Sequence, residues 1–322
     1  MADSWHECIS DELDSVEDVM NDVIRSDNPE LVEMCKYVLA HHGKRIRPAI
    51  CILSFYACGG TDPKRAINVG AAVELIHNAT LVHDDINDNG DMRRGAKALY
   101  KEYSLGKSVV AGDYMYALGF RLLGSSSSEI VDYVIEAASD MGSGEFSQKK
   151  YERNTSVGEN DYMKIISGKT AGLIECAAKC GAFIATPDDL RNIESAGNFA
   201  FKAGQAFQIV DDVLDVIGDS KVTGKRAGND IVECKPTLPI IYAMQDPSVG
   251  KRVGEIFEDE NSDYDDAAEA ISLIEKTDSI ERCLKKARDI AAEAVSYLDF
   301  AKESVYKNSL VSLVNFFVSR DR

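Results

Sequence analysis

The chain has 322 residues, with 36 Lys and Arg against 54 Asp and Glu, which gives a formal net charge of −18 at pH 7. This charge argues against nonspecific binding to nucleic acid or to an anionic membrane surface. No apolar run approaches the roughly 20 residues that a membrane-spanning helix needs. The eight cysteines are scattered without a CxxC pair and no charged-then-apolar leader opens the sequence, so we expect a cytoplasmic protein with reduced thiols.

The positions of the prolines and the spacing of the apolar residues predict a series of amphipathic helices. A side-chain acceptor followed by proline is typical of a helix start, and four such pairs occur, at residues 28–29, 62–63, 186–187 and 246–247. Polar or glycine-rich breaks lie at residues 59–60, 89–96, 124–128 and 218–234. Strand-like alternation is nearly absent, so we predict one all-α domain that spans residues 1–322.

The most informative feature is an acidic signature, DDxxD, that occurs at residues 84–88 and again at 211–215. Apolar periodicity leads into both copies, so each is expected near the C-terminal end of a long helix. The first and last aspartates of a copy are then one turn apart and face the same way. Such hard oxygen ligands favour Mg²⁺, and Mg²⁺ indicates a phosphate-bearing substrate. The candidate metal ligands are Asp84, Asp85, Asp88, Asp211, Asp212 and Asp215.

Two compact basic segments stand out in this acidic chain, GKRIRP at residues 43–48 and RRG at 93–95. Arginine binds diphosphate oxygens in a bidentate manner and lysine supplies a movable point charge, so both segments are candidate anion sites. Taken alone, either segment also fits a solvated surface. His77 lies two turns before Asp84 and faces roughly the same way, so it is a candidate donor to a phosphate oxygen; a core histidine is the alternative.

These motifs, in this order and over most of the chain, resemble the trans-type isoprenyl diphosphate synthases. The matching stretches are GKRIRP at 43–48, ELIHNATLVHDDINDNGDMRRG at 74–95, AGDYMYA at 111–117, SGKTAGL at 167–173, GQAFQIVDDVLD at 204–215 and GKRAGNDIVECKPTLP at 224–239. The resemblance implies a large antiparallel helical bundle around a central cavity, and a homodimer. It also implies an enzyme of isoprene biosynthesis that joins isopentenyl diphosphate to an allylic diphosphate and releases pyrophosphate.

The resemblance also implies a role for each matching residue. The six aspartates would bind Mg²⁺, three ions per active site with substrate bound, and these ions would hold the allylic diphosphate. Further contacts to that substrate are expected from Arg93, Lys169, Thr170, Gln208, Lys225 and Lys235. A separate, metal-independent pocket for isopentenyl diphosphate is expected from Gly43, Lys44, Arg47, His77 and Arg94, with Arg45 as a further contact. Direct catalytic roles are expected for Asp84, Asp85, Asp88, Lys169, Asp211 and Lys225.

The expected reaction follows from these charges. Mg²⁺ and the cationic side chains stabilise the negative charge of the departing pyrophosphate, so the allylic C–O bond ionises. The isopentenyl double bond then attacks the carbocation while water is excluded. No general base stands out, so pyrophosphate is the expected proton acceptor. The polar loop at 218–234 is the expected lid, with Arg320 and Arg322 as candidates for closing it.

Product length is expected to depend on the residues that precede the first acidic signature. In the family that the chain resembles, bulky side chains there stop the growing prenyl chain. Ala79 and Thr80 are small, so the chain should pass them towards Ile76, and Tyr114, Met115, Tyr116 or Phe120 are candidate floor residues. We therefore predict a C25 to C35 product, with C20 as the main competitor. The alternative is that Ala79 is small only for helix packing.

Three other readings compete with a chain-elongating synthase. A class I terpene cyclase also ionises a prenyl diphosphate with Mg²⁺, but it needs no isopentenyl diphosphate pocket and usually lacks a second DDxxD. A non-catalytic regulatory subunit normally loses an aspartate signature, and both are present. An acidic helical protein with solvated aspartates would not match six separate stretches. Two departures from the family pattern are residues 96–100 and Cys234, which stands where glycine commonly precedes Lys235.

Overall fold

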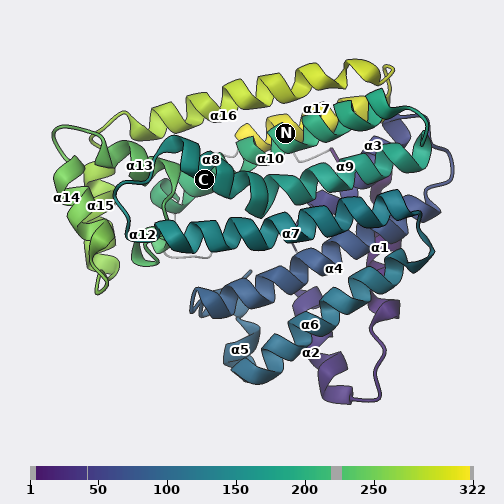
Figure 1. Ribbon diagram of the computed structural model, residues 1–322, viewed down its shortest axis with the longest axis horizontal. Helices are drawn as coiled ribbons and strands as arrows, with labels where there is room; N and C mark the ends of the chain where they lie inside the picture. Colours follow the sequence, from purple (N-terminus) through teal and green to yellow (C-terminus); the bar gives the residue numbers. More distant parts are fainter. Residues whose placement is uncertain (1–4, 42, 219–226, 320–322) are drawn as a thin grey trace. The chain divides into compact units, whose positions relative to one another are not determined.

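The computed structural model describes residues 5–41, 43–218 and 227–319. Apart from one short hairpin, the regular elements of these residues are helices (Figure 1), which confirms the predicted fold class. Contacts group the chain into two compact units, each assembled from segments that are distant in sequence. These are Met1–Ala138, Leu173–Gly197 and Leu298–Ser312 for the first unit, and Ser139–Gly172, Asn198–Tyr297 and Leu313–Arg322 for the second. A single domain over residues 1–322 stays a prediction.

The first unit is built around one long helix, α4. Its elements, including helices that continue into the second unit, are η1 (Glu7–Ile9), α1 (Ser10–Val23), α2 (Pro29–Ala40), α3 (Ile46–Ala57), α4 (Lys64–Asn87), β1 (Met92–Arg93), β2 (Ala96–Lys97), α5 (Leu99–Glu102), α6 (Leu105–Leu122), η2 (Leu123–Ser125), α7 (Ser128–Tyr151), α9 (Gly172–Ala185), α10 (Leu190–Ile217) and α17 (Val305–Val318). Helices α1, α3 and α6 pack against α4, and α6 runs beside it (Figure 1). Its neighbours cover the middle of α4 on all sides, so that every residue from 69 to 76 is buried.

A two-stranded hairpin follows α4 and was not predicted. Strands β1 and β2 pair antiparallel, with Met92 opposite Lys97 and Arg93 opposite Ala96. The two turn residues, Arg94 and Gly95, both have positive φ, at 51° and 80°, as a type I′ turn requires. Strands of two residues are too short to give a periodic signal, and Arg-Gly is not the usual sequence of this turn. The hairpin fixes the directions of the two arginines.

The second unit contains a further group of short helices. Its elements beyond the shared helices are α8 (Glu159–Ile166), η3 (Ser167–Ala171), α12 (Asn229–Val232), α13 (Leu238–Met244), α14 (Gly250–Glu258), α15 (Tyr264–Ile274) and α16 (Ser279–Ser296). The short helix η4 (Tyr297–Phe300) begins at the last residue of this unit's segment and continues into the first unit. Helices α13, α14 and α15 pack on one another (Figure 1) around buried Ile240, Val253 and Phe257. This apolar cluster also contains Ile231 and Cys234, so it supports the segment just before Lys235.

The predicted helix starts are right in one case and early in three. Asn28 is the N-cap of α2, and its side chain accepts hydrogen bonds from two backbone N–H groups of the first turn. Helices α4, α10 and α14 begin at Lys64, Leu190 and Gly250, after the proline in each case. At Asp246 the carboxylate accepts from the N–H two residues on at 2.8 Å, which forms a turn before the helix begins.

The cysteines and the apolar segments are as expected from the sequence. All eight cysteines are free, as their scattered spacing predicts. Cys176 and Cys180 lie one turn apart on α9 with 3.9 Å between their sulfur atoms. Among the helices of the described residues, none combines the length and the apolar character that crossing a membrane requires.

Candidate active site

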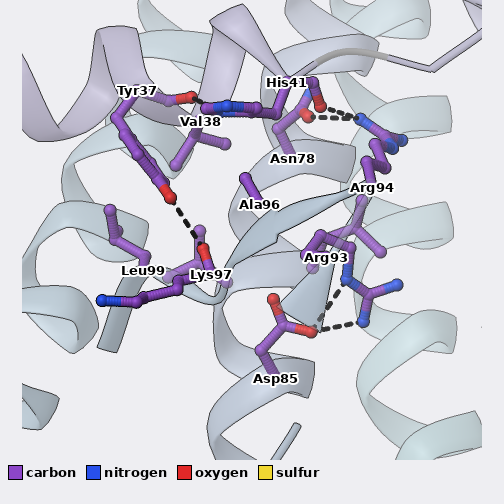
Figure 2. Close-up of a pocket in the computed structure, with 12 residues that line it drawn as sticks. Tyr37, Val38, His41, Asn78, Asp85, Arg93, Arg94, Ala96, Lys97 and Leu99 are labelled. Atoms are coloured by element: carbon purple, nitrogen blue, oxygen red, sulfur yellow. Dashed lines mark hydrogen bonds and ion pairs between the residues drawn. The ribbon is translucent and has the colours of Figure 1, made fainter. Parts of the chain in front are cut away.

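The first aspartate cluster lies at the C-terminal end of α4, as predicted. Asp84 and Asp85 belong to its last turn, and Asp88 is the C-cap, whose backbone N–H donates to the Asp84 carbonyl oxygen at 2.9 Å. Asp85 is buried, and its Oδ1 accepts hydrogen bonds from Arg93 Nε at 2.8 Å and from Arg93 Nη2 (Figure 2). The structure therefore places Arg93 beside the acidic cluster.

Arg94 is directed to a different set of partners (Figure 2). Its Nη1 donates to the His41 carbonyl oxygen at 3.2 Å and to Asn78 Oδ1 at 3.5 Å. A Cβ at Gly43 would lie 2.9 Å from Arg94 Nη2, so glycine at this position leaves room for the guanidinium. The predicted partners Gly43 and Arg94 thus lie together, and Lys44 beside them is exposed.

A small cavity lies between α2, α4 and the hairpin. Arg93 and Arg94 line it together with mainly apolar neighbours such as Val38 and Leu99 (Figure 2), and its volume is about 30 Å³. Tyr37 on α2 closes one side, since its hydroxyl donates to the carbonyl oxygen of Lys97 at 2.9 Å. This volume suits about two water molecules, so a diphosphate must bind outside this cavity.

Arg45 is held by acidic side chains within the first unit. It is 6% exposed, and its Nη1 donates to Glu74 Oε1 at 2.8 Å. Its Nη2 donates to Glu17 Oε2 at 3.0 Å, and its Nε donates to the other oxygen of Glu17. A buried guanidinium with two carboxylate partners is already neutralised. This geometry gives Arg45 a structural role and does not support its assignment as a further diphosphate contact.

Arg47, two residues on, has a different environment. Its Nε is buried without a hydrogen-bond partner among the described residues, and burial lowers the pKa of this guanidinium to about 10. Burial, followed by the positive charges of Arg47 and Arg94, lowers the pKa of His77 well below its ordinary value of 6.5. A buried donor that lacks an acceptor costs free energy, which a bound anion would recover. Arg47, His77 and Arg94, together called the cationic pocket, therefore lie near one another in surroundings suited to an anion, with Glu74 as the carboxylate beside them.

The low pKa of His77 predicts a pH-dependent stability. Above pH 6.5 the imidazole is neutral in both states, but below it the unfolded chain binds a proton that the folded protein resists. The folded protein should therefore lose stability as the pH falls below about 6.5. Urea unfolding of the wild type and of His77→Gln between pH 7.5 and pH 5 checks this. The free energy of unfolding should fall less in the variant than in the wild type. An equal fall in both proteins would contradict the role of His77 in this pH dependence.

The second aspartate cluster lies near the C-terminal end of α10, also as predicted. Asp211 is exposed, whereas Asp212 is 5% exposed. Burial and the nearby Asp230 raise the pKa of Asp212 well above its ordinary value, although hydrogen bonds to its carboxylate oppose the shift. Asp215 Oδ2 accepts from the backbone N–H of Asp230 at 3.0 Å. Asp215 thus also fastens the start of α12 to the end of α10.

Thr170 and Gln208 form a hydrogen-bonded chain that ends on Asp212. Thr170 Oγ1 donates to Gln208 Oε1 at 2.8 Å, and Gln208 Nε2 donates to Asp212 Oδ1 at 2.8 Å. Gln208 and Asp212 are one turn apart on α10, so the helix itself sets this contact. The structure brings these three predicted residues together.

Lys169 lies in η3, a π-helical turn packed closely on α7. A Cβ at Gly144 would lie 2.6 Å from the backbone nitrogen of Lys169, and one at Gly168 would lie 2.8 Å from the Asp140 carbonyl oxygen. Only glycine at both positions permits this approach. It brings Lys169 Nζ to 2.5 Å from Glu145 Oε2 and 3.3 Å from Gln148 Oε1.

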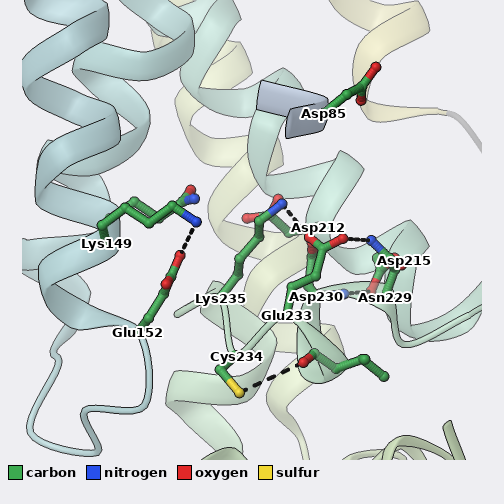
Figure 3. Close-up of polar contacts among 12 residues, drawn as sticks. Asp85, Lys149, Glu152, Asp212, Asp215, Asn229, Asp230, Glu233, Cys234 and Lys235 are labelled. Atoms are coloured by element: carbon green, nitrogen blue, oxygen red, sulfur yellow. Dashed lines mark hydrogen bonds and ion pairs between the residues drawn. The ribbon is translucent and has the colours of Figure 1, made fainter. Parts of the chain in front are cut away.

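Lys235 lies beside Glu233 (Figure 3) and follows a residue with left-handed backbone, Cys234. Cys234 has φ of 54° and is 1% exposed, which explains why glycine suits this position in the family pattern. Lys235 Nζ lies 2.5 Å from Glu233 Oε2, and Asn229 Nδ2 donates to Glu233 Oε1 at 2.6 Å. Cysteine therefore adopts the turn that glycine would adopt, and Lys235 is held by Glu233.

Three residues named from the sequence lie outside the described residues. They are Lys225, which was assigned to substrate binding and catalysis, and the candidate closing residues Arg320 and Arg322. Their roles stay predictions.

Comparison with known proteins decides the family. The family model described as Polyprenyl synthetase matches residues 28–274. The chain belongs to the polyprenyl synthetase family. It is a trans-isoprenyl diphosphate synthase, a prenyltransferase that elongates prenyl chains by condensing isopentenyl diphosphate with allylic diphosphates. This sets aside the terpene cyclase, the regulatory subunit and the protein with solvated aspartates.

The names of similar proteins indicate products of different lengths. The chain is 32% identical to the all-trans-nonaprenyl-diphosphate synthase (geranyl-diphosphate specific) of Rhodobacter capsulatus, over 97% of this chain and 96% of that protein. It is also 32% identical to the geranylgeranyl pyrophosphate synthase of Geoglobus acetivorans, over 98% and 99%. A solved polyprenyl synthase from Caulobacter crescentus CB15, complexed with calcium and isoprenyl diphosphate, superposes with a TM-score of 0.94 at 28% identity, over 99% and 98%.

The carboxylates of the synthase fit a divalent cation that arrives with its substrate. Among the described residues, no three His, Cys, Asp or Glu side chains group closely enough to hold a metal ion by themselves. Mg²⁺ does not need such a cage, because it keeps several waters and binds through one or two carboxylates together with substrate phosphates. The oxygen donors at the ends of α4 and α10 suit this mode of binding.

The sequence did not predict which uncharged or acidic side chains contact the candidate site residues. Asn78 contacts Arg94, Tyr162 contacts Asp212, and Glu145 and Glu233 pair with the two lysines. Asn78 and Glu233 lie inside the matching stretches and Tyr162 lies just before one, whereas Glu145 lies outside them, and no pattern marks any of the four. Each contact other than that of Glu233 joins segments well separated in sequence.

Proposed function

We propose that this synthase holds its two substrates in chemically different sites, one that depends on Mg²⁺ and one formed by cationic side chains, and that it makes a C25 to C35 product. The observation that carries the proposal is the pocket of Arg47, His77 and Arg94. It offers a buried donor and a neutral imidazole to an anion, and the carboxylate beside it, Glu74, already accepts a hydrogen bond from Arg45. Such a pocket is suited to isopentenyl diphosphate.

In this proposal the six aspartates bind Mg²⁺, about three ions with substrate present, and the ions hold the allylic diphosphate. Bound Mg²⁺ would supply positive charge that stabilises the departing pyrophosphate. Asp84, Asp88, Asp211 and Asp215 are the members with some solvent exposure, so they are suited to bind an ion that keeps its waters. Asp85 and Asp212 are buried and hydrogen-bonded, so they also orient their neighbours.

Lys169, Lys235 and Arg93 would contact the same diphosphate directly. Each is paired with a carboxylate in the structure, namely Glu145, Glu233 and Asp85. These pairings keep the cations ordered before substrate binds, which reduces the entropy that ordering them would otherwise cost. The phosphate oxygens would then share or displace the carboxylates. Thr170 and Gln208 would complete this set, and Lys225 is assigned to it by resemblance.

The proton released after condensation is not assigned to any of these side chains. His77 is neutral, but in this proposal it lies in the isopentenyl diphosphate pocket as a hydrogen-bond donor. The lysines and arginines are cationic and cannot accept a proton. We therefore assign proton acceptance to the pyrophosphate that the first step releases, which Lys169 and Lys235 would hold in place.

Product length in this proposal depends on α4 and α6. Ala79 and Ile76 are fully buried, and a Cβ at Gly119 of α6 would lie 2.7 Å from Ile76 Cγ1. Thr80 is half-buried, and its hydroxyl donates to the His77 carbonyl oxygen at 2.7 Å. None of the three side chains on α4 is aromatic. This supports a product longer than C20, while burial of Ala79 leaves helix packing as the alternative reason for its size.

The candidate floor residues on α6 are placed differently from one another. The Tyr114 hydroxyl donates to the Arg25 carbonyl oxygen at 2.7 Å, which directs this side chain to the segment before α2. Met115 is fully buried, and Tyr116 and Phe120 are half-buried. Tyr116 and Phe120 are therefore the preferred floor residues.

Replacing Ala79 by phenylalanine should shorten the product to C15 or C20, because an aromatic ring would occupy the space through which the prenyl chain extends. Reversed-phase chromatography of the dephosphorylated products measures this. Ala79→Ser is the matched control, since it adds one oxygen and should leave the product distribution nearly unchanged. An unchanged product in Ala79→Phe would show that residue 79 only packs helices.

Direct assay tests the proposed function as a whole. The purified protein is incubated with Mg²⁺, isopentenyl diphosphate and each of the C5, C10, C15 and C20 allylic primers, and the products are sized. Elongation that stops between C25 and C35 is expected. Products that stop at C20 would correct the length alone, and no elongation from any primer would overturn the proposal.

We also propose that the synthase is a cytoplasmic homodimer. Leu105, Val109 and Val110 on α6 and Ile135 on α7 are large apolar side chains exposed on the first unit, between 37% and 57%. The three on α6 lie within six residues of one another along one helix, and an exposed apolar surface of this kind is typical of a protein interface. Light scattering should give about twice the chain mass of 35.3 kDa.

A further inference from the structure

Tyr162 is a buried polar residue that the proposed function leaves without a role. It lies in the first half of α8 and is 2% exposed. Its hydroxyl donates to Asp212 Oδ2 at 2.6 Å, a length typical of a hydrogen bond to a charged oxygen. Tyr162 and Asp212 lie in separate segments of the second unit, so the contact connects two helices.

Each of the two carboxylate oxygens of Asp212 accepts a hydrogen bond from a different helix. Oδ1 accepts from Gln208 on α10, which in turn accepts from Thr170 in η3. Oδ2 accepts from Tyr162 on α8. With a donor on each oxygen, the carboxylate cannot turn about its Cβ–Cγ bond without breaking a buried hydrogen bond.

The tyrosine itself is rigidly placed. The backbone N–H of Gly158 donates to Asp161 Oδ2 at 3.2 Å, and the Tyr151 hydroxyl donates to Asp161 Oδ1 at 2.9 Å. Both oxygens of Asp161 are therefore hydrogen-bonded, which fixes the first turn of α8. A phenol ring has only two rotatable bonds, so burial fixes its hydroxyl at small entropic cost.

We propose that Tyr162 is a positioning residue that orients the carboxylate of Asp212, and through it the metal-binding end of α10. The inference rests on the proposed function, in which the second aspartate cluster binds Mg²⁺ with a diphosphate. Side chains that hydrogen-bond a metal-binding carboxylate typically affect metal affinity by 10- to 100-fold. Tyr162 touches no reacting atom and acts only through Asp212.

Tyr162→Phe tests this, with Tyr242→Phe as the matched control. Tyr242 is also buried in the second unit, and its hydroxyl donates to a carboxylate oxygen, Glu159 Oε2, at the same 2.6 Å. Titration calorimetry with Mg²⁺ and inorganic pyrophosphate gives a readout that is independent of turnover. Tyr162→Phe should weaken this binding by about 10-fold, and should raise the Mg²⁺ concentration for half-maximal activity while leaving the KM for isopentenyl diphosphate unchanged. Tyr242→Phe should change neither.

A second pair of variants separates positioning from packing. In an Asp212→Asn background, Tyr162→Phe should weaken pyrophosphate binding by no more than about twofold further, because the hydroxyl acts through that carboxylate. Equal binding by wild type and Tyr162→Phe, equal losses in the two tyrosine variants, or additive losses with Asp212→Asn would each overturn the role of Tyr162. A wild type that does not bind pyrophosphate with Mg²⁺ would overturn the proposed function as well.

Discussion

Asp84→Asn is expected to lower kcat by roughly 1,000-fold, since losing one preorganised stabilising group in an active site costs about this much. Asparagine keeps the shape of the side chain but removes its charge, so a cation at the end of α4 would be held less tightly. The KM for isopentenyl diphosphate should change little, because that substrate is assigned to the cationic pocket. Steady-state kinetics over a range of Mg²⁺ concentrations measures both quantities.

Asp91→Asn is the control for this experiment. Asp91 lies just beyond the first acidic signature, and its carboxylate forms an exposed ion pair with Lys101 at 2.7 Å. Exposed pairs contribute little, so this variant should retain nearly full activity. A similar kcat for Asp84→Asn and the wild type would remove Asp84 from the metal site.

Arg47→Gln is expected to raise the KM for isopentenyl diphosphate by roughly 100-fold, because removing a buried charge that binds an anion costs about 2–5 kcal/mol. The glutamine retains polarity and some length but has no charge. The half-saturating Mg²⁺ concentration should stay near that of the wild type, since no metal is assigned to this pocket. Kinetics with each substrate varied in turn separates the two effects.

Arg45→Met should affect stability, whereas Arg47→Gln should affect substrate binding. It leaves the buried Glu74 and the half-buried Glu17 without their partner, so the free energy of unfolding should fall by about 3 kcal/mol. Its KM for isopentenyl diphosphate should be unchanged in the folded fraction. If Arg45→Met instead raised this KM as much as Arg47→Gln did, Arg45 would belong to the diphosphate site after all.

The sequence was sufficient for features that depend on local patterns. Apolar periodicity correctly places Asp84 and Asp211 near the ends of long helices, since a helix of fixed period carries its pattern along the chain. The Asn28-Pro29 start was also correct, because an N-cap is a local contact. Gly43 and Arg94 are brought together as the resemblance implied, although nothing in their own spacing required it.

Contacts between distant segments could not be predicted in this way. The pairing of Arg45 with Glu17 and Glu74, and the contact of Tyr162 with Asp212, depend on how helices pack rather than on period. The hairpin was missed because its strands have two residues each. A charged residue in a basic motif looks the same in sequence whether it faces a ligand or a glutamate of its own chain.

Arg93 and Arg94 illustrate how one short turn can serve two ligands of the same charge. Adjacent Cα atoms are only about 3.8 Å apart, yet Arg93 contacts Asp85 and Arg94 contacts Asn78 and the His41 carbonyl oxygen. The left-handed backbone at Arg94 and Gly95 produces this divergence. In the proposed function, two diphosphates of like chemistry would thus be told apart by the directions of two side chains that are adjacent in the sequence.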